Sequence, residues 1–194
     1  MSVFFISDTH FSHRAIIKYS TRTFSSVDEM DETMIDNWNK LVKPTDTVWH
    51  LGDFSFARGG ALEEILRRLN GSINLCPGNH DKEIIKNIQW LLDEKLFASI
   101  QHYKELKGYL PDRLPIVLFH YGMRVWNKSH FGSIHLYGHS HGSLPPHGKS
   151  VDVGVDCKEI TDEYRPIHLD EVLQYMSTRN YERVDHHRAR GEVE

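Results

Sequence analysis

Hydrophobic residues in the first part of the chain alternate between short continuous runs and spaced, helix-like patterns. Runs of four or five mainly apolar residues are typical of buried strands, and they occupy residues 3–6, 47–51 and 73–76. The stretches between them carry apolar residues at intervals of three and four, as in helices that cover a sheet. Strand, helix, strand, helix, strand over residues 3–77 therefore predicts a βαβ sheet with right-handed crossovers.

The clearest predicted helix starts after Ser26. Ser26 and Glu29 have the spacing of a capping box, and Lys43-Pro44 ends the helical pattern. The side chains expected on its buried face are Met30, Met34, Trp38 and Leu41. Further helices are expected over residues 61–69, 82–92 and 169–176.

The pattern changes after about residue 96. Short apolar or alternating runs broken by Gly and Pro fill residues 100–155, which predicts a second, more antiparallel set of strands. Residues 179–194 are charged and nearly without apolar side chains, so we expect a flexible tail there. The remaining residues, 1–178, are expected to form a single domain.

Composition narrows the classes of function. The 194 residues carry a formal net charge of −4, so no extended nucleic-acid surface is expected and any affinity for phosphate must be local. No apolar run approaches the ~20 residues of a membrane span, and no secretory signal is recognisable. Two cysteines are too few for a disulfide framework. We expect a cytoplasmic protein that does not enter a membrane, whereas the oligomeric state cannot be inferred from the sequence.

Five apolar runs end directly in polar side chains that bind metals. Carboxylate oxygen, imidazole nitrogen and amide oxygen are donors to hard divalent and first-row metal ions. The residues delivered by these strand ends are Asp8, His10, Asp53, Asn79, His120, His139 and His141. The pattern therefore predicts a metal site at one edge of the sheets.

Seven ligands are too many for a single metal ion that must also leave a coordination position open for substrate. Two ions that share one carboxylate would use all seven. Two ions at ~3.5–4 Å would lower the pKa of a shared water toward ~7 and hold a substrate oxygen. Two divalent ions outweigh the two carboxylates, so the loaded site would be positive and would favour a phosphate substrate. Manganese suits the mixed His and carboxylate set, and iron, zinc, nickel and magnesium stay open.

These motifs, in this order, resemble the calcineurin-like metallophosphoesterase superfamily, in particular its small bacterial and phage members. The resemblance rests on Asp8-x-His10, Gly52-Asp53, Gly78-Asn79-His80-Asp81, His120 and Gly138-His139-Ser140-His141. It implies an α/β fold, a four-layer α/β/β/α sandwich of two mixed β-sheets flanked by helices. The dimetal site would then lie at the strand ends.

The resemblance also implies residue roles. One ion would be held by Asp8, His10, Asp53 and His141, and the other by Asp53, Asn79, His120 and His139. Asp53 would then bridge the ions, and His80 would correspond to the histidine that protonates the leaving oxygen or holds the phosphoryl group. Family members often carry an Asp three residues after the bridging one, where it orients that histidine. Phe56 stands at this position here, so His80 needs another partner.

We therefore expect a metal-dependent hydrolase of phosphate mono- or diesters, acting on a small phosphorylated or nucleotide substrate. A hydroxide bridging the ions would attack, with Asp53 and His80 as the catalytic residues. A phosphodiesterase or nuclease acting on nucleotides or cyclic nucleotides is one alternative, and a non-catalytic interaction scaffold is another. The candidates for substrate contacts, each of which could equally be a solvated or locally packed side chain, are His13, Arg14, Arg22 and Arg124.

Overall fold

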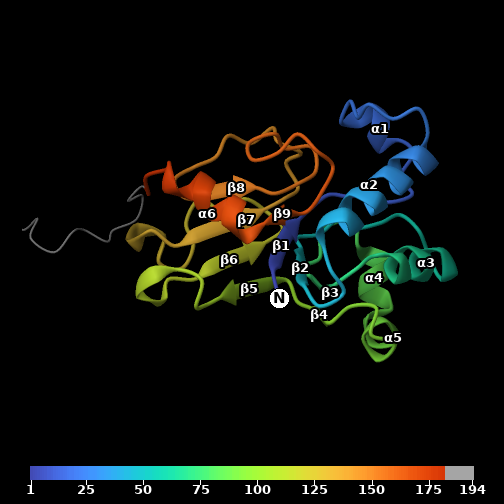
Figure 1. Ribbon diagram of the computed structural model, residues 1–194, viewed down its shortest axis with the longest axis horizontal. Helices are drawn as coiled ribbons and strands as arrows, with labels where there is room; N and C mark the ends of the chain where they lie inside the picture. The colour runs from blue at the N-terminus through green and yellow to red at the C-terminus, as the bar shows by residue number, and fades with distance from the viewer. Residues whose placement is uncertain (182–194) are drawn as a thin grey trace, which may run out of the picture.

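Residues 1–181, which the computed structural model describes, form two mixed β-sheets flanked by helices, as predicted (Figure 1). The first sheet has the strand order β4-β3-β2-β1-β9, in which β1 to β4 are parallel and β9 is antiparallel. Its strands are β1 (Val3–Ile6), β2 (Thr47–His50), β3 (Ser72–Leu75), β4 (Ser99–Ile100) and β9 (Ile167–His168). The predicted βαβ order over residues 3–77 is confirmed.

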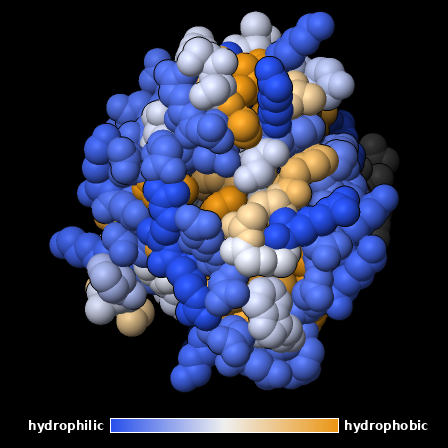
Figure 2. Space-filling view, turned by 90° about the vertical axis from the view of Figure 1, so that its right-hand side faces the viewer, coloured by the Kyte–Doolittle hydropathy of each residue, from blue (hydrophilic) through white to orange (hydrophobic). Residues whose placement is uncertain are grey.

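Helices connect the parallel strands and cover one face of this sheet (Figure 1). These helices are α1 (Ile16–Tyr19), α2 (Val27–Leu41), α3 (Gly60–Arg68), α4 (Lys82–Lys86) and α5 (Ile88–Asp93). Helix α6 (Leu169–Ser177) follows β9 and packs in the core that the first sheet shares with the second. The single helix predicted over residues 82–92 is divided at Asn87, whose side-chain amide donates to the Glu83 carbonyl at 2.8 Å. The outward side of the α2 to α5 region is mainly hydrophilic, with a few hydrophobic side chains between polar ones (Figure 2).

The capping box predicted for α2 is half formed. Ser26 Oγ accepts the Glu29 N–H at 3.1 Å, as expected for an N-cap. The Glu29 carboxylate instead accepts the N–H of Ser25 at 2.8 Å, one residue before the cap.

The second sheet has the order β5-β6-β7-β8, in which only β5 and β6 are antiparallel. Its strands are β5 (Tyr103–Leu106), β6 (Ile116–Phe119), β7 (Ile134–Tyr137) and β8 (Ser150–Asp152). The prediction of a more antiparallel set was therefore wrong. The crossovers from β6 to β7 and from β7 to β8 contain no α-helix, only the short 3-10 helix η2 (Ser129–Phe131), so no helical periodicity marked them as parallel connections.

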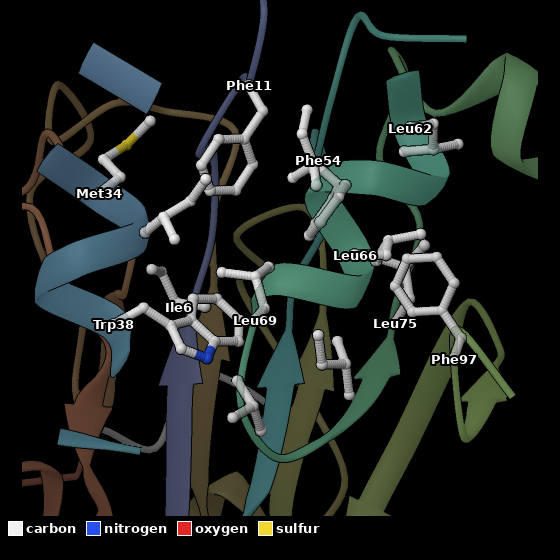
Figure 3. Packing of buried hydrophobic residues seen from close by; sticks show 14 of the residues in the cluster. Ile6, Phe11, Met34, Trp38, Phe54, Leu62, Leu66, Leu69, Leu75 and Phe97 are labelled. Atoms are coloured by element: carbon white, nitrogen blue, oxygen red, sulfur yellow. The ribbon is translucent and has the colours of Figure 1, made fainter. Parts of the chain in front are cut away.

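The first sheet packs against a hydrophobic core on each face. Successive side chains of a strand point to opposite faces, so neighbouring residues enter different cores. Phe4 and Ile6 join the core beneath α2 and α3 (Figure 3), whereas Val3 and Phe5 join a second core with residues of the other sheet and of α6. This arrangement places the loops that follow the strands of both sheets close to one another.

In the described part of the chain, no helix is long and apolar enough to cross a membrane. Most of the predicted tail, residues 182–194, lies outside the described residues.

Candidate metal centre

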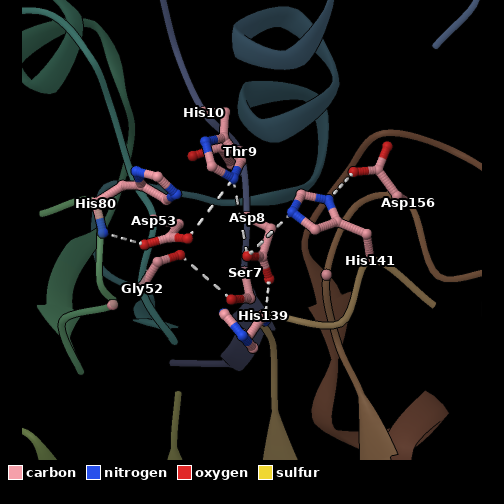
Figure 4. Close-up of polar contacts among 12 residues, drawn as sticks. Ser7, Asp8, Thr9, His10, Gly52, Asp53, His80, His139, His141 and Asp156 are labelled. Carbon is pink, nitrogen blue, oxygen red and sulfur yellow. Dashed lines mark hydrogen bonds and ion pairs between the residues drawn. The ribbon is translucent and has the colours of Figure 1, made fainter. Parts of the chain in front are cut away.

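The seven predicted ligands lie together, although they come from strand ends in both sheets. Figure 4 labels Asp8, His10, Asp53, His139 and His141 among them. The ligands fall into two groups: Asp8, His10 and His141 in one, and Asp53, His120 and His139 in the other. Within each group, one ligand atom from each residue lies within 4.8 Å of the others. The seventh predicted ligand, Asn79, adjoins the second group, where its Oδ1 lies 3.2 Å from His120 Nε2.

Asp53 lies between the two groups. Its Oδ2 is 3.7 Å from His10 Nε2 in the first group and 3.7 Å from His120 Nε2 in the second. Its other oxygen, Oδ1, accepts the backbone N–H of His80 at 2.8 Å. This bond fixes the carboxylate with Oδ2 directed at both groups.

Three buried side-chain atoms of the first group, each able to coordinate a metal, have no hydrogen-bond partner among residues 1–181. They are Asp8 Oδ1, His10 Nδ1 and His10 Nε2. An unsatisfied buried polar atom typically costs about 1–3 kcal/mol, so such atoms require an explanation. Oxygen and imidazole nitrogen atoms that converge without protein partners fit the donor set of a divalent cation.

The charges of this group also favour a cation. Burial, together with the nearby Asp152, raises the pKa of Asp8 well above its ordinary value. Burial lowers the pKa of His10 to about 2, which keeps the ring neutral and its lone pair available. A positive ion would stabilise the ionised Asp8 in this buried place.

The backbone is strained at five of the seven predicted ligands. Asp8, His10, Asp53, His139 and His141 all have φ between 48° and 67°, a region that residues other than glycine seldom adopt. Such strain is concentrated at functional sites, where the surrounding structure maintains it. Positive φ turns each strand end sharply, so that its side chain points at the shared centre.

Two of the imidazole rings are held by hydrogen bonds from Nδ1. His120 Nδ1 lies 2.7 Å from the Leu51 carbonyl, to which it must donate, and His141 Nδ1 lies 2.7 Å from Asp156 Oδ2. In both rings, Nε2 is thereby left to face the predicted ion. Fixing the far ring nitrogen in this way is how proteins orient metal-binding histidines.

Arg22 has a different place from the one predicted. Its guanidinium is fully buried and binds both oxygens of Asp156 at 2.8 Å. Its remaining N–H groups go to the Asp8 and Thr9 carbonyls and to Met30 Sδ. With every donor engaged, Arg22 cannot contact a substrate, and it instead ties the first metal loop to Asp156.

Three further side chains outside the predicted ligand set hold the loops in place. Asp81 accepts three backbone N–H groups, Asp152 accepts those of Gly142 and Gly154, and His50 accepts that of Gly52 and bonds to Thr9. Asp156 directly follows Val153-Gly154-Val155, the same signal that marked the ligands, whereas Asp152 is the last residue of β8. A search for every Asp or His after an apolar run would have found Asp156.

Gly138 shows how closely these loops approach. A Cβ at this position would overlap Ser7 Oγ and Asp8 Oδ2. The backbone of the next residue, His139, donates to Asp8 Oδ2 at 2.9 Å. Only glycine allows the two loops to come this near.

The His80 ring is exposed, and within residues 1–181 no side chain forms a hydrogen bond or ion pair with it. Its neighbours are rings: the centroid of His10 is 5.6 Å away and that of Phe56 is 5.2 Å away. Asp81, the adjacent carboxylate, is buried and directed at backbone amides instead. No substitute for the missing family Asp is therefore present in the described residues.

The remaining candidates for substrate contacts lie in different places. His13 reaches the centre, with its ring centroid 5.4 Å from that of His10. Arg14 is exposed, and no contact joins it to the predicted ligands. Arg124 contacts His147 at 3.0 Å and lines a separate pocket with Tyr137 and Leu144.

Comparison with known proteins points to one family. The sequence pattern of the Calcineurin-like phosphoesterase superfamily domain matches residues 1–151. The uncharacterized protein MJ1445 of Methanocaldococcus jannaschii is 33% identical over 181 residues, covering 89% of this chain and 89% of that protein. The Gene 66 protein of Mycobacterium phage L5 is 25% identical over 205 residues, covering 88% of this chain and 97% of that protein. Among solved structures, the protein of unknown function AQ665 from Aquifex aeolicus has a TM-score of 0.65 and 25% identity, covering 89% of this chain and 98% of that one.

Proposed function

The chain belongs to the calcineurin-like phosphoesterase superfamily, as its motifs predicted, and we propose that it hydrolyses phosphate mono- or diesters with two divalent metal ions. The position of Asp53 carries the proposal. Its Oδ2 is 3.7 Å from a ring nitrogen of each group, so one carboxylate can serve both ions. Bound ions would supply an activated water and positive charge at the phosphoryl group.

The residues would divide between the ions as the motifs imply. Asp8, His10 and His141 would hold one ion, Asn79, His120 and His139 the other, and Asp53 both. Manganese suits this mixture of imidazole and carboxylate donors. The unpartnered Asp8 and His10 atoms support this assignment most directly.

His80 would act at the leaving oxygen of the substrate. Its exposed ring lies beside His10 and next in sequence to Asn79, so a bound ester can reach both the ions and this ring. Protonated, the ring would give a proton to the oxygen that leaves phosphorus. Neutral, it would hold a phosphoryl oxygen through its N–H.

The test is recovery of activity by metal-free protein. After chelation, hydrolysis of p-nitrophenyl phosphate and of bis(p-nitrophenyl) phosphate should be absent and should return with manganese, iron, zinc, nickel or magnesium.

Asp53→Asn should abolish turnover and weaken both ion sites, because the shared charge is lost. Asp36→Asn, an exposed change on α2, should behave as the unmodified protein. Metal binding without turnover for any of these ions would instead support a non-catalytic scaffold.

A further inference from the structure

A pocket of about 260 Å³ adjoins the metal centre on the side of His80. It lies between the loop after β2 and helix α4. Asn79 and His80 form its inner wall, and Phe56, Arg58, Lys82 and Lys86 form much of the rest. Because His80 is the residue proposed to meet the leaving oxygen, this pocket lies where the leaving group of a substrate would go.

The pocket is positively charged in a protein that is negative overall. Arg58, Lys82 and Lys86 line it against a single carboxylate, Glu83. Within residues 1–181, no carboxylate forms an ion pair with any of these three cations, whereas Arg67 and Arg68 on α3 are paired with Glu63 and Glu32. Three unpaired cations around one hollow fit an anionic group, and a phosphate is the anion that Arg and Lys both bind well.

Phe56 gives the pocket a flat apolar wall. Its ring is 39% exposed, yet it is held in place because it stacks on His13 with centroids 3.7 Å apart and planes 16° apart. A fixed, exposed aromatic ring beside cations is the arrangement on which nucleobases stack.

We infer that the leaving group of the substrate is a single nucleotide, an inference that rests on the proposed phosphoesterase function. The base stacks on Phe56, and the nucleotide's own 5′ phosphate binds Arg58, Lys82 and Lys86. Its 3′ oxygen meets His80. In the reaction, the oxygen of water joins phosphorus, the bond from phosphorus to the 3′ oxygen breaks, and the 3′ oxygen takes a proton. The substrate is therefore a phosphodiester between nucleotides whose first nucleotide is 5′-phosphorylated.

Size and charge limit this substrate to a short one. A pocket of about 260 Å³ lies below the usual ligand-pocket range of about 300–1,000 Å³, so it suits one nucleotide at most. The chain carries 27 acidic residues against 23 Lys and Arg, which gives no basic track for a long strand.

The experiment compares dithymidylate carrying a 5′ phosphate with dithymidylate lacking it. Metal-loaded protein should cleave both, with a KM about tenfold lower for the phosphorylated form because of its charge-assisted contacts. Lys82→Ala/Lys86→Ala should remove that difference, and Lys40→Ala/Lys43→Ala, two lysines at the opposite end of the sheet, should retain it. Phe56→Leu should raise KM for both substrates, by roughly tenfold for the lost base stacking.

The reaction products show which phosphate lies at the ions, and a binding measurement tests the pocket even without turnover. The phosphorylated dinucleotide should yield only thymidine 5′-monophosphate. Release of inorganic phosphate would place the terminal phosphate at the ions and would overturn the inference, as would equal KM values for the two substrates. If neither is cleaved, the proposed function fails, but calorimetry in the presence of a chelator still tests the pocket. The phosphorylated form should then bind more tightly to the unmodified protein than to Lys82→Ala/Lys86→Ala, and equal binding would refute the pocket.

Discussion

Histidines in this site differ in what fixes their rings. His120 and His141 are each anchored through Nδ1, by a carbonyl and a carboxylate, so their orientation is set before anything binds. His80 has no such anchor within residues 1–181, and the rings of His10 and Phe56 lie beside it. A substrate that forms a hydrogen bond to His80 would therefore also orient it.

His80→Ala should separate chemistry from metal binding. Loss of a general acid typically lowers the rate by about 10²–10⁴-fold, and we expect that loss in kcat. The two ion sites should be unaffected, because the His80 side chain contacts no predicted ligand by a hydrogen bond. Turnover and metal content, measured on the same preparation, check both parts.

His102→Ala is the matched control, because His102 is an exposed histidine outside the site. It should change neither quantity. Loss of bound metal from His80→Ala would mean that His80 is itself a metal ligand and would contradict its proposed role.

At the scale of elements, Asp81 joins the loops that follow β2 and β3. Its carboxylate accepts the N–H groups of Gly78, Asp53 and Phe54, each at 2.8 Å. The residue is 1% exposed, so no solvent substitutes for these bonds. Both loops carry predicted ligands, and Asp81 therefore determines their relative position.

Asp81→Ala should lower the free energy of unfolding by about 3 kcal/mol, because it leaves buried N–H groups without an acceptor. Urea denaturation in the presence of a chelator measures this without a contribution from bound metal. Asp93→Ala, an exposed position at the end of α5, serves as the comparison and should stay within about 0.5 kcal/mol of the unmodified protein. A similarly small change for Asp81→Ala would mean that the loops are held by other contacts.

At the scale of the whole molecule, the centre exists only when both sheets are in place. Its predicted ligands span residues 8–141 and come from β1, β2 and β3 of one sheet and from β6 and β7 of the other. An unfolded chain cannot bring these side chains together. Ion binding is therefore coupled to folding.

Divalent metal should consequently raise the melting temperature. At a metal concentration about 100 times Kd, the stabilisation is about 2.7 kcal/mol, which corresponds to roughly 5–10 °C for a chain of this size. Thermal melts with manganese and with chelator measure the shift. Asp53→Asn should show much less of it, and an equal shift in that variant would mean that the metal acts elsewhere on the protein.

The sequence by itself determined the strands, the βαβ order and the set of residues that meet at the centre. These follow from local patterns: an apolar run that must be buried, and a polar side chain directly after it. Because parallel strands end at one edge of a sheet, the pattern also predicted that Asp8, Asp53 and Asn79 would be neighbours.

Only the tertiary structure decided what each polar side chain contacts. Arg22 resembled a substrate ligand in the sequence, but Asp156, 134 residues away, binds it in the interior. The parallel strands of the second sheet and the loop contacts of Asp81 were not predictable either, nor was the lack of a partner for the His80 ring within residues 1–181. Such contacts depend on which loops the packed sheets bring within hydrogen-bonding distance, and the local order of residues does not contain that information.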